Sequence, residues 1–295
     1  MAAATASPPA PLPPAAPSET CRSAWRAVGR FGLSVLLISL ILAWLVAPWV
    51  GLSWWKVFRR CVSIAAALGL WLCIKRFEGR TLRSYGLGAW AGPGGGKRQL
   101  LFGVGLGLAA LGLMLGIGVA SGAVRVELTP DRMRLWRTAL GFVPAAALVS
   151  VLEELVFRGV LLQRLMACST PLAVGLSSAC YALVHLKAPA LTAQTSRELV
   201  GLFLLGVVLS GCYLRTRQLY LAIGLHAALA YGARVNKLVI AFADPSNAWL
   251  IGTSRLIDGM AAWAALAGIG GCALWWTRRR RGVTDPGTAL SSARR

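Results

Sequence analysis

The chain is short of acidic side chains and of charge in general. Only ten Asp and Glu occur in 295 residues, against 31 Lys and Arg, and charged residues make up 14% of the chain. Soluble proteins usually carry about a quarter charged residues, so a water-soluble globular fold is not expected. With 57% hydrophobic residues, the chain is also too apolar to be disordered over most of its length. This composition predicts a membrane protein.

The excess of basic residues does not form one continuous surface along the chain. A net charge of +21 would suit a nucleic-acid-binding protein if Lys and Arg lined one face or stripe. They fall instead in short clusters between apolar runs. We therefore expect contact with the lipid bilayer and its anionic headgroups, and no nucleic-acid partner.

Several motifs of well-known enzyme and membrane folds are absent. The sequence has no P-loop or GxGxxG fingerprint, no HExxH pair of a zincin-type site, no repeat of fixed period and no period-2 alternation typical of a β-barrel. Its seven cysteines include no CxxC pair, and no disulfide framework is indicated. Their expected role is that of small apolar side chains in the helices.

Long uncharged runs are the main feature that the sequence does have. The runs at 31–55 and 99–124 each exceed the roughly 20 residues that a helix needs to cross a bilayer. Small residues such as Gly103 and Gly107 lie in them and allow close packing of helices in lipid. The expected fold class is all-α, a polytopic membrane protein with about eight transmembrane helices. The other six expected helices cover 57–74, 138–168, 171–186, 199–214, 218–243 and 259–277.

The two ends are predicted to lie outside the membrane. Residues 1–30 form a Pro/Ala-rich, basic and disordered tail, 31–277 the membrane-embedded domain, and 278–295 a basic C-terminal tail. An even number of helices puts both termini on one side, and the positive-inside rule assigns that side to the cytoplasm. The loop at 75–98, with six Lys and Arg, agrees, whereas the loop at 125–137, with four Arg, does not. This pattern predicts a multi-pass protein, most simply of a bacterial inner membrane.

Two acids lie where a charge is least expected. Glu153 and Glu154 stand side by side in the predicted helix at 138–168, whereas the other eight acids are expected in tails, loops or helix ends. An ionisable group inside a membrane span is costly and indicates a functional site. Glu154 and Arg158 are four residues apart on one helix face, as in a structural ion pair. Glu153 points about 100° away, and it is the better candidate for a reactive carboxylate.

Both histidines of the chain, His185 and His226, lie in apolar helices. One buried histidine is more often a helix–helix hydrogen bond than a catalyst, but two of them with a diacid in the membrane favour a site. Glu153 and His185 are each 16 residues from position 169 in a predicted turn, so an antiparallel hairpin places both about 24 Å from its tip. His226 is expected only about 14 Å from its own turn. His226 lies at the same depth in the membrane as Glu153 and His185 only if the tip at 158–170 protrudes into water.

Two chemistries fit one carboxylate and two imidazoles. Glu153 can act as a general base on water while His185 and His226 donate hydrogen bonds to the developing oxyanion. Alternatively, these three side chains are a sufficient ligand set for a catalytic zinc with an open water position. Both arrangements fit hydrolysis of an amide bond. The metal-free one is favoured because Glu153 beside Glu154 and Arg158 looks like a tuned base, so zinc is allowed but no cofactor is required.

Three short motifs resemble those of the CPBP family of intramembrane proteins. The family pattern is EExxxR, then FxxxH, then HxxxN or HxxxD, on an eight-helix intramembrane core. This family includes the Rce-type CAAX prenyl endopeptidases and the bacteriocin-immunity (Abi) proteins, and the likeness covers about 138–232. The residues that match are Glu153, Glu154, Arg158, Tyr181, His185 and His226.

The resemblance implies an endopeptidase that cleaves a protein or peptide substrate at the membrane. Glu153 matches the family's catalytic glutamate, which activates water, and Glu154 and Arg158 match its supporting pair. His185 and His226 match the histidines of the site. A prenylated CAAX protein is one substrate class that the family offers.

Two positions depart from the family pattern. Tyr181 stands where the family has Phe, which keeps an aromatic wall. Ala230 stands where Asn or Asp is expected, a side chain that the family uses to help stabilise the oxyanion or hold the water. Its absence implies a weaker enzyme, another donor such as Tyr231 or Asn236, or lost activity. Asn236 is ten residues from His226 on a different helix face, so we do not expect it to take this role.

Two alternatives to a peptidase remain. Ala230 favours a catalytically weak or inactive membrane scaffold, or a bacteriocin-immunity-type protein, whereas the intact EExxxR motif and both histidines oppose it. A proton-coupled transporter would use the diacid and the histidines as a relay. Transporters often show inverted repeats with broken helices, and no such repeat is visible, so this alternative ranks last.

Overall fold

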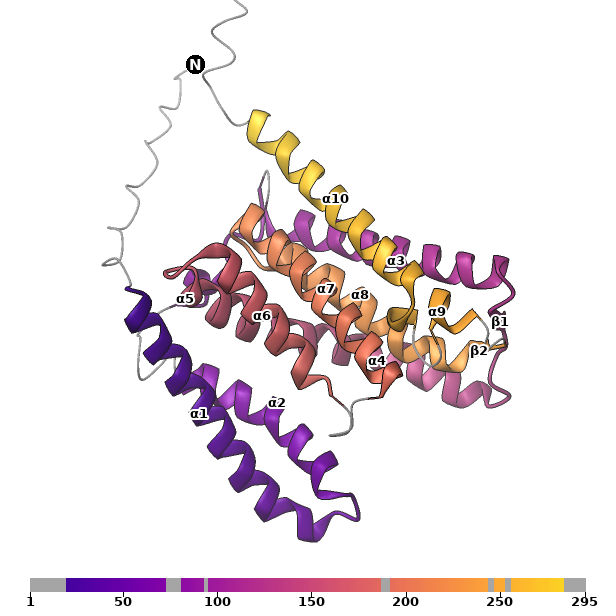
Figure 1. The fold of residues 1–295 in the computed structure, drawn as a ribbon, viewed down its shortest axis with the longest axis horizontal. Helices are drawn as coiled ribbons and strands as arrows, with labels where there is room; N and C mark the ends of the chain where they lie inside the picture. Colours follow the sequence, from indigo (N-terminus) through magenta and orange to yellow (C-terminus); the bar gives the residue numbers. More distant parts are fainter. Residues whose placement is uncertain are drawn as a thin grey trace, which may run out of the picture.

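The computed structural model describes residues 20–72, 81–92, 95–186, 192–243, 247–252 and 256–283. The parts of the two expected tails at 1–19 and 284–295 lie outside these residues, as does part of the basic loop predicted at 75–98. The described chain is mostly helical (Figure 1), which confirms the all-α prediction.

Each predicted apolar run coincides with one long helix, although the boundaries differ. Short helical segments connect some of them: η1 (Ala47–Trp49), η3 (Leu82–Tyr85), η5 (Asn236–Leu238), α9 (Ala248–Ile251) and η7 (Leu256–Asp258). The long helices are α1 (Cys21–Val46), α2 (Trp54–Leu72), α3 (Gly96–Ala120), α4 (Arg132–Glu154), α6 (Thr170–Val184), α7 (Ala193–Thr216), α8 (Tyr220–Val235) and α10 (Met260–Val283). Between α4 and α6 the chain continues through a π-helix, η4 (Leu155–Leu162), and α5 (Gln163–Leu165).

The described helices include five that are long and apolar enough to cross a membrane. Large apolar side chains such as Trp44, Leu140 and Leu148 are exposed on their outer faces, as expected for contact with lipid. The protein is therefore an integral membrane protein. The count of eight spans is not confirmed, because α2 carries three basic residues and α6 and α8 have only 15 and 16 residues. The five are Cys21–Trp49, Gly96–Ala120, Arg132–Leu165, Ala193–Thr216 and Met260–Thr277.

The predicted helix at 218–243 is too long. α8 ends at Val235, and the chain then forms β2 (Ile240–Phe242), which pairs antiparallel with β1 (Val124–Val126). The β-branched and aromatic residues of these two segments favour extended backbone when they can pair across strands. α3 stops at Ala120 because Gly122 adopts a left-handed conformation with φ 71°. The two strands lie at the end of the bundle near α9 (Figure 1).

The N-terminal boundary predicted at residue 30 is wrong for the described residues. α1 begins at Cys21, because the side chain of Thr20 caps the helix by accepting a hydrogen bond from the backbone N–H of Ser23. Residues 21–30 are therefore helical rather than part of a disordered tail.

The cysteines were expected to serve only as small apolar side chains, but two of them do not. Cys21 and Cys168 form a disulfide across 147 positions of the sequence, and it ties the start of α1 to the segment after α5. Disulfides persist in oxidising compartments and are rare in the cytosol. The bond therefore opposes the cytoplasmic location expected for the N-terminal side, and the orientation of the chain stays a prediction.

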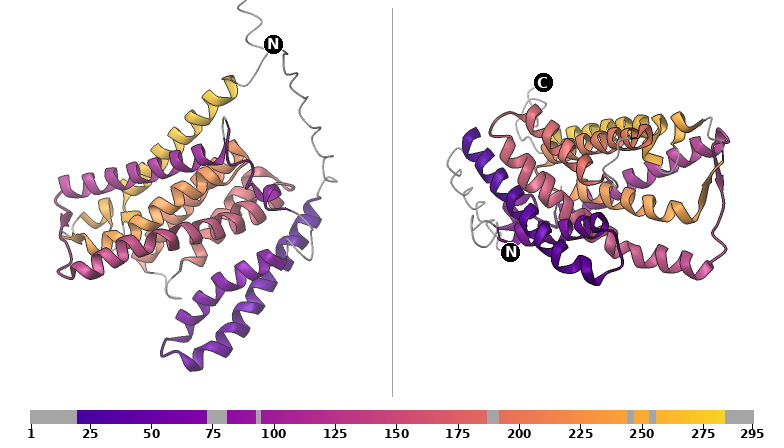
Figure 2. Two further views of the ribbon diagram at one scale, coloured as in Figure 1. Left: turned by 180° about the vertical axis from the view of Figure 1, so that it is seen from behind. Right: turned by 60° about the horizontal axis from the view of Figure 1, so that its bottom comes forward.

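α4, α6, α7 and α8 form the centre of the bundle, and α3 and α10 cover it on one side (Figure 1). α3 packs most extensively against α8, α6 against α7, and α4 against α8. The α1–α2 hairpin stands to one side of this bundle in Figure 1 and in the left-hand view of Figure 2.

Glycines allow the close approach of α3 and α8. A Cβ atom at Gly103 would collide with the backbone carbonyl of Leu221, and one at Gly224 would collide with that of Leu100. Small residues at a helix interface permit such backbone contact in lipid. The packing matters for function because α8 carries His226.

Gly103→Val should separate α3 from α8 and lower the stability of the protein. Overpacking of a close interface costs about 1–3 kcal/mol, because the clash is with backbone that cannot rotate away. Thermal unfolding in detergent measures the effect. Gly105→Val is the matched control, since Gly105 lies two residues away on the exposed face with nothing within 4 Å of an added Cβ. Equal unfolding temperatures for the two variants would contradict this account of the interface.

Candidate active site

Four helical segments bring the five predicted site residues together. Glu153 and Glu154 end α4, and Arg158 lies in the π-helix that follows; His185 caps the C-terminus of α6, and His226 lies in the middle of α8. The Oε2 atom of Glu153 is 3.6 Å from Nε2 of His185 and 3.7 Å from Nε2 of His226. The three side chains therefore lie at one level of the bundle.

Glu153, His185 and His226 lie at the same depth in the bundle, but not because the tip at 158–170 protrudes, as the helix lengths suggested. Arg158, the first residue of the 158–170 tip, is completely buried. The helix changes from α to π directly after Glu154. Such π segments inside helices are frequent at functional sites, because they rotate the side chains that follow relative to the α-helical path.

A buried group of charged side chains holds one histidine in place. Oε1 of Glu154 accepts a hydrogen bond from Nη1 of Arg158 at 2.9 Å and lies 2.9 Å from Nδ1 of His226. Nη2 of Arg158 donates to the carbonyl oxygen of Gly206 in α7 at 3.0 Å. Glu154 and Arg158 are both 0% exposed. Since buried charges require partners, these contacts link α4, the π-helix, α7 and α8 around His226.

The hydrogen-bond partners of the two rings determine which nitrogen carries the proton. Nδ1 of His226 faces the Glu154 carboxylate, and Nδ1 of His185 lies 2.7 Å from the carbonyl oxygen of Tyr181. Carboxylate and carbonyl oxygens only accept, so both Nδ1 atoms donate. In the neutral rings, both Nε2 atoms therefore present a lone pair to Oε2 of Glu153.

Three acceptor atoms thus converge on one small volume. Oε2 of Glu153 is buried and has no hydrogen-bond partner among the described residues. None of the three atoms can donate to another while the carboxylate is ionised and the rings are neutral. A water molecule placed between Glu153 and a histidine would donate one hydrogen to each and keep a lone pair free. This arrangement is suited to activation of water by a general base.

The site opens into an apolar cavity of about 200 Å³. Apolar side chains from α3, α7, α8 and α10, Ala230 among them, form most of its walls, and Tyr181 and Asn236 also line it. Asn236 lies ten residues beyond His226, or about 15 Å along a helix. Tyr231 is not at the cavity, because its hydroxyl donates to the carbonyl oxygen of Ala139. Neither of the two substitutes considered for the side chain lost at position 230 therefore lies beside His226.

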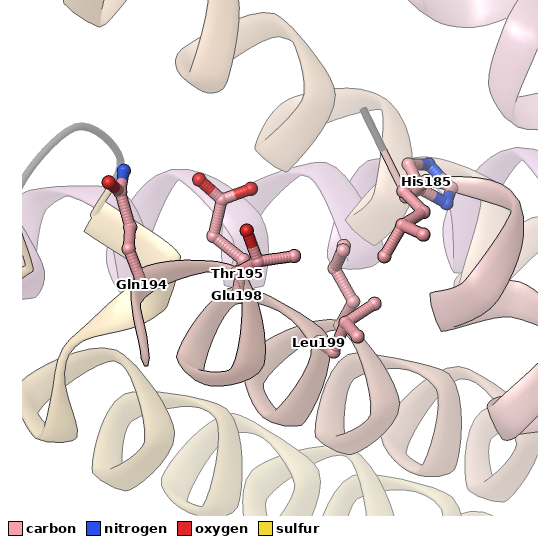
Figure 3. A pocket seen from close by; sticks show the side chains of 7 residues that line it. His185, Gln194, Thr195, Glu198 and Leu199 are labelled. Atoms are coloured by element: carbon pink, nitrogen blue, oxygen red, sulfur yellow. The ribbon is translucent and has the colours of Figure 1, made fainter. Parts of the chain in front are cut away.

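A second cavity, of about 190 Å³, is also lined by His185. Figure 3 shows Gln194, Thr195 and Glu198 on one face of α7, with His185 beyond them. Glu198 is only 6% exposed, which corrects the expectation that it is peripheral. In the sequence, Glu198 stands directly before an apolar run, but nothing in the sequence placed it in one cavity with His185. Asp258 was also expected to be peripheral and is buried.

Zinc was allowed for Glu153, His185 and His226 but was not required. Within the described residues, no group of three or more His, Cys, Asp or Glu meets the spacing of a metal-binding cluster. The separations from Oε2 of Glu153 to the two Nε2 atoms are 3.6 and 3.7 Å, and a water molecule hydrogen-bonded between Glu153 and a histidine needs no metal.

A family model of type II CAAX prenyl endopeptidase Rce1-like proteins matches residues 135–232. The match runs from α4 to α8 and includes all five site residues. The match supports membership of the CPBP family. No curated protein matches the chain. The matched segment also contains Ala230, where the family pattern has Asn or Asp.

Proposed function

We propose that the protein is an intramembrane endopeptidase in which Glu153 activates water for hydrolysis of a peptide bond. The observation that carries the proposal is the convergence of Oε2 of Glu153 with the Nε2 atoms of His185 and His226. Family membership supports the same reaction class. The five residues assigned to the site in the sequence are the ones that the proposal uses.

Hydrolysis at this site follows from the positions of the acceptor atoms. The water gives a proton to Oε2 of Glu153 while its oxygen bonds to the peptide carbonyl carbon, and the carbonyl oxygen takes up the displaced electron pair. Glu153 then returns the proton to the amide nitrogen as the C–N bond breaks. The second hydrogen of the water is accepted by Nε2 of one histidine beside Glu153, and the Glu154–Arg158 pair keeps His226 in the required tautomer.

The cavity indicates the kind of substrate. Leucine side chains line the volume next to the site, so an apolar side chain of a protein or peptide at the membrane is the proposed occupant. A prenylated peptide is the substrate class that the family suggests. The proposed location is a bacterial inner membrane, and no nucleic acid takes part. The sequence predicts both termini in the cytoplasm, whereas the Cys21–Cys168 disulfide favours an oxidising compartment for the N-terminal side.

A cleavage assay separates this function from its main alternative. Protein reconstituted in lipid nanodiscs is incubated with a farnesylated CAAX peptide and with the same peptide unprenylated, and the products are identified by mass spectrometry. His185→Ala and His226→Ala should each reduce cleavage about 100-fold or more, because each removes one of the two nitrogen acceptors beside the proposed general base. Gln218→Ala, which breaks a hydrogen bond with Gln99 outside the site, should not.

The alternative is a catalytically weak or inactive scaffold, or a protein of the bacteriocin-immunity type. The observation that favours it is Ala230, which puts no polar group into the cavity one helical turn from His226. If the protein is a scaffold, a phenotype that depends on its partner should persist in both the His185→Ala and the His226→Ala variant. The wild-type protein would then cleave neither peptide.

A further inference from the structure

The hydroxyl of Tyr181 lies inside the proposed site. It is 3.3 Å from Nε2 of His226, the same nitrogen that lies 3.7 Å from Oε2 of Glu153. Tyr181 is buried and lines the apolar cavity beside both histidines. The hydroxyl is therefore next to the place where the peptide carbonyl would react.

The surroundings of Tyr181 hold its ring in one orientation. The ring packs edge-on against Phe157 and His226, with centroid distances of 5.4 and 5.6 Å. The guanidinium carbon of Arg158 lies 4.9 Å from the ring centroid. A cation at this distance from an aromatic ring is attracted to its face. The ring is thus fixed by packing, while the hydroxyl hydrogen can still rotate about the C–O bond.

The tautomer of His226 makes Tyr181 a hydrogen-bond donor. Because Nδ1 of His226 donates to Glu154, its Nε2 accepts from the Tyr181 hydroxyl in the neutral ring. When water adds to a peptide carbonyl, negative charge develops on the carbonyl oxygen. The O–H of Tyr181 can turn to that oxygen, and a positioned donor of this kind stabilises the transition state.

Few other neutral donors line the cavity. Its described polar residues are Tyr181, the two histidines and Asn236, and Asn236 is about 15 Å along the helix from His226. Ala230 has no polar group to offer. A Phe at position 181 would leave the carbonyl oxygen without a neutral donor next to His226.

We propose that Tyr181 is a catalytic residue, whose hydroxyl donates a hydrogen bond to the oxyanion and replaces a polar side chain missing at position 230. This inference rests on the proposed peptidase function. It changes the significance of Tyr181, which the sequence suggested was only an aromatic wall. The two departures from the family pattern, at 181 and 230, compensate for each other.

The test is a set of variants in the same nanodisc assay with the farnesylated CAAX peptide. Tyr181→Phe removes only the hydroxyl and should lower kcat about 100-fold, with KM changed less than about twofold, since the donor acts on charge formed in the transition state. Ala230→Asn in the Tyr181→Phe background should give a kcat at least about tenfold higher than that of Tyr181→Phe alone, because the amide would face the same cavity. Tyr231→Phe, which removes a tyrosine hydroxyl bonded to backbone outside the cavity, is the matched control and should match the wild type.

The outcomes separate this inference from the proposed function. If Tyr181→Phe cleaves like the wild type while Glu153→Gln is inactive, the peptidase stands and the role of Tyr181 is rejected. A loss of kcat that Ala230→Asn does not recover also rejects it, because the hydroxyl would then act only by holding His226. If the wild type shows no cleavage that depends on Glu153, both the function and this inference are overturned.

Discussion

Glu153→Gln should abolish peptide cleavage and leave the protein folded. The amide keeps the shape of the side chain but cannot take a proton from water, and a general base contributes about 10²–10⁴-fold to the rate. We expect a loss of about 1,000-fold or more. The measurement is the initial rate of cleavage of the farnesylated CAAX peptide in nanodiscs, with product masses to confirm the position of the cut.

The fold should tolerate this change because of what surrounds Glu153. Its side chain is 22% exposed, and its Oε2 has no hydrogen-bond partner among the described residues. An amide NH₂ at this place can donate to a histidine Nε2, so the unfolding temperature should stay within about 2 °C of the wild type, which for a chain of this size corresponds to less than about 1 kcal/mol. Unchanged cleavage by a well-folded Glu153→Gln protein would reject Glu153 as the base.

Arg158→Met should cause the largest loss of stability of any site substitution. It leaves the Glu154 carboxylate buried without its cation and the Gly206 carbonyl without its donor. Removing one partner of a buried pair typically costs about 3–5 kcal/mol. Denaturation in mixed micelles should show a loss of this order, together with reduced yield of folded protein.

A double-mutant cycle separates the charge from the packing. Glu154→Gln with Arg158→Met replaces the buried pair by neutral side chains of similar size, so most of the lost stability should return. The double variant should nevertheless stay inactive, because His226 loses the carboxylate that orients it. If the single Arg158→Met variant is as stable as the double variant, the unpaired Glu154 carboxylate is not the cause of the lost stability.

The sequence by itself was sufficient for the class of fold and for naming five residues that the structure brings together. In lipid, backbone groups must be satisfied within a helix or a closed barrel, so long uncharged runs without alternation predict helices directly. The candidate site residues could also be identified from the sequence. Glu153 and Glu154 are the two acids in the middle of an apolar run, and the two histidines are the only ones in the chain. The i, i+4 spacing also predicted the Glu154–Arg158 pair, which the structure confirms at 2.9 Å.

Contacts between distant segments were decided only by the tertiary structure. The disulfide between Cys21 and Cys168, the β1–β2 pair and the bond from Arg158 to Gly206 join residues that no local pattern relates. The level of His226 could not be derived from ideal helices, because the true ends of α8 and the π-helix after Glu154 set the axial positions. Hydrogen-bond partners then fixed the histidine tautomers and turned the Tyr181 hydroxyl toward His226. Periodicity along one helix specifies which face is buried, whereas the side chains that meet across that face depend on how the helices pack.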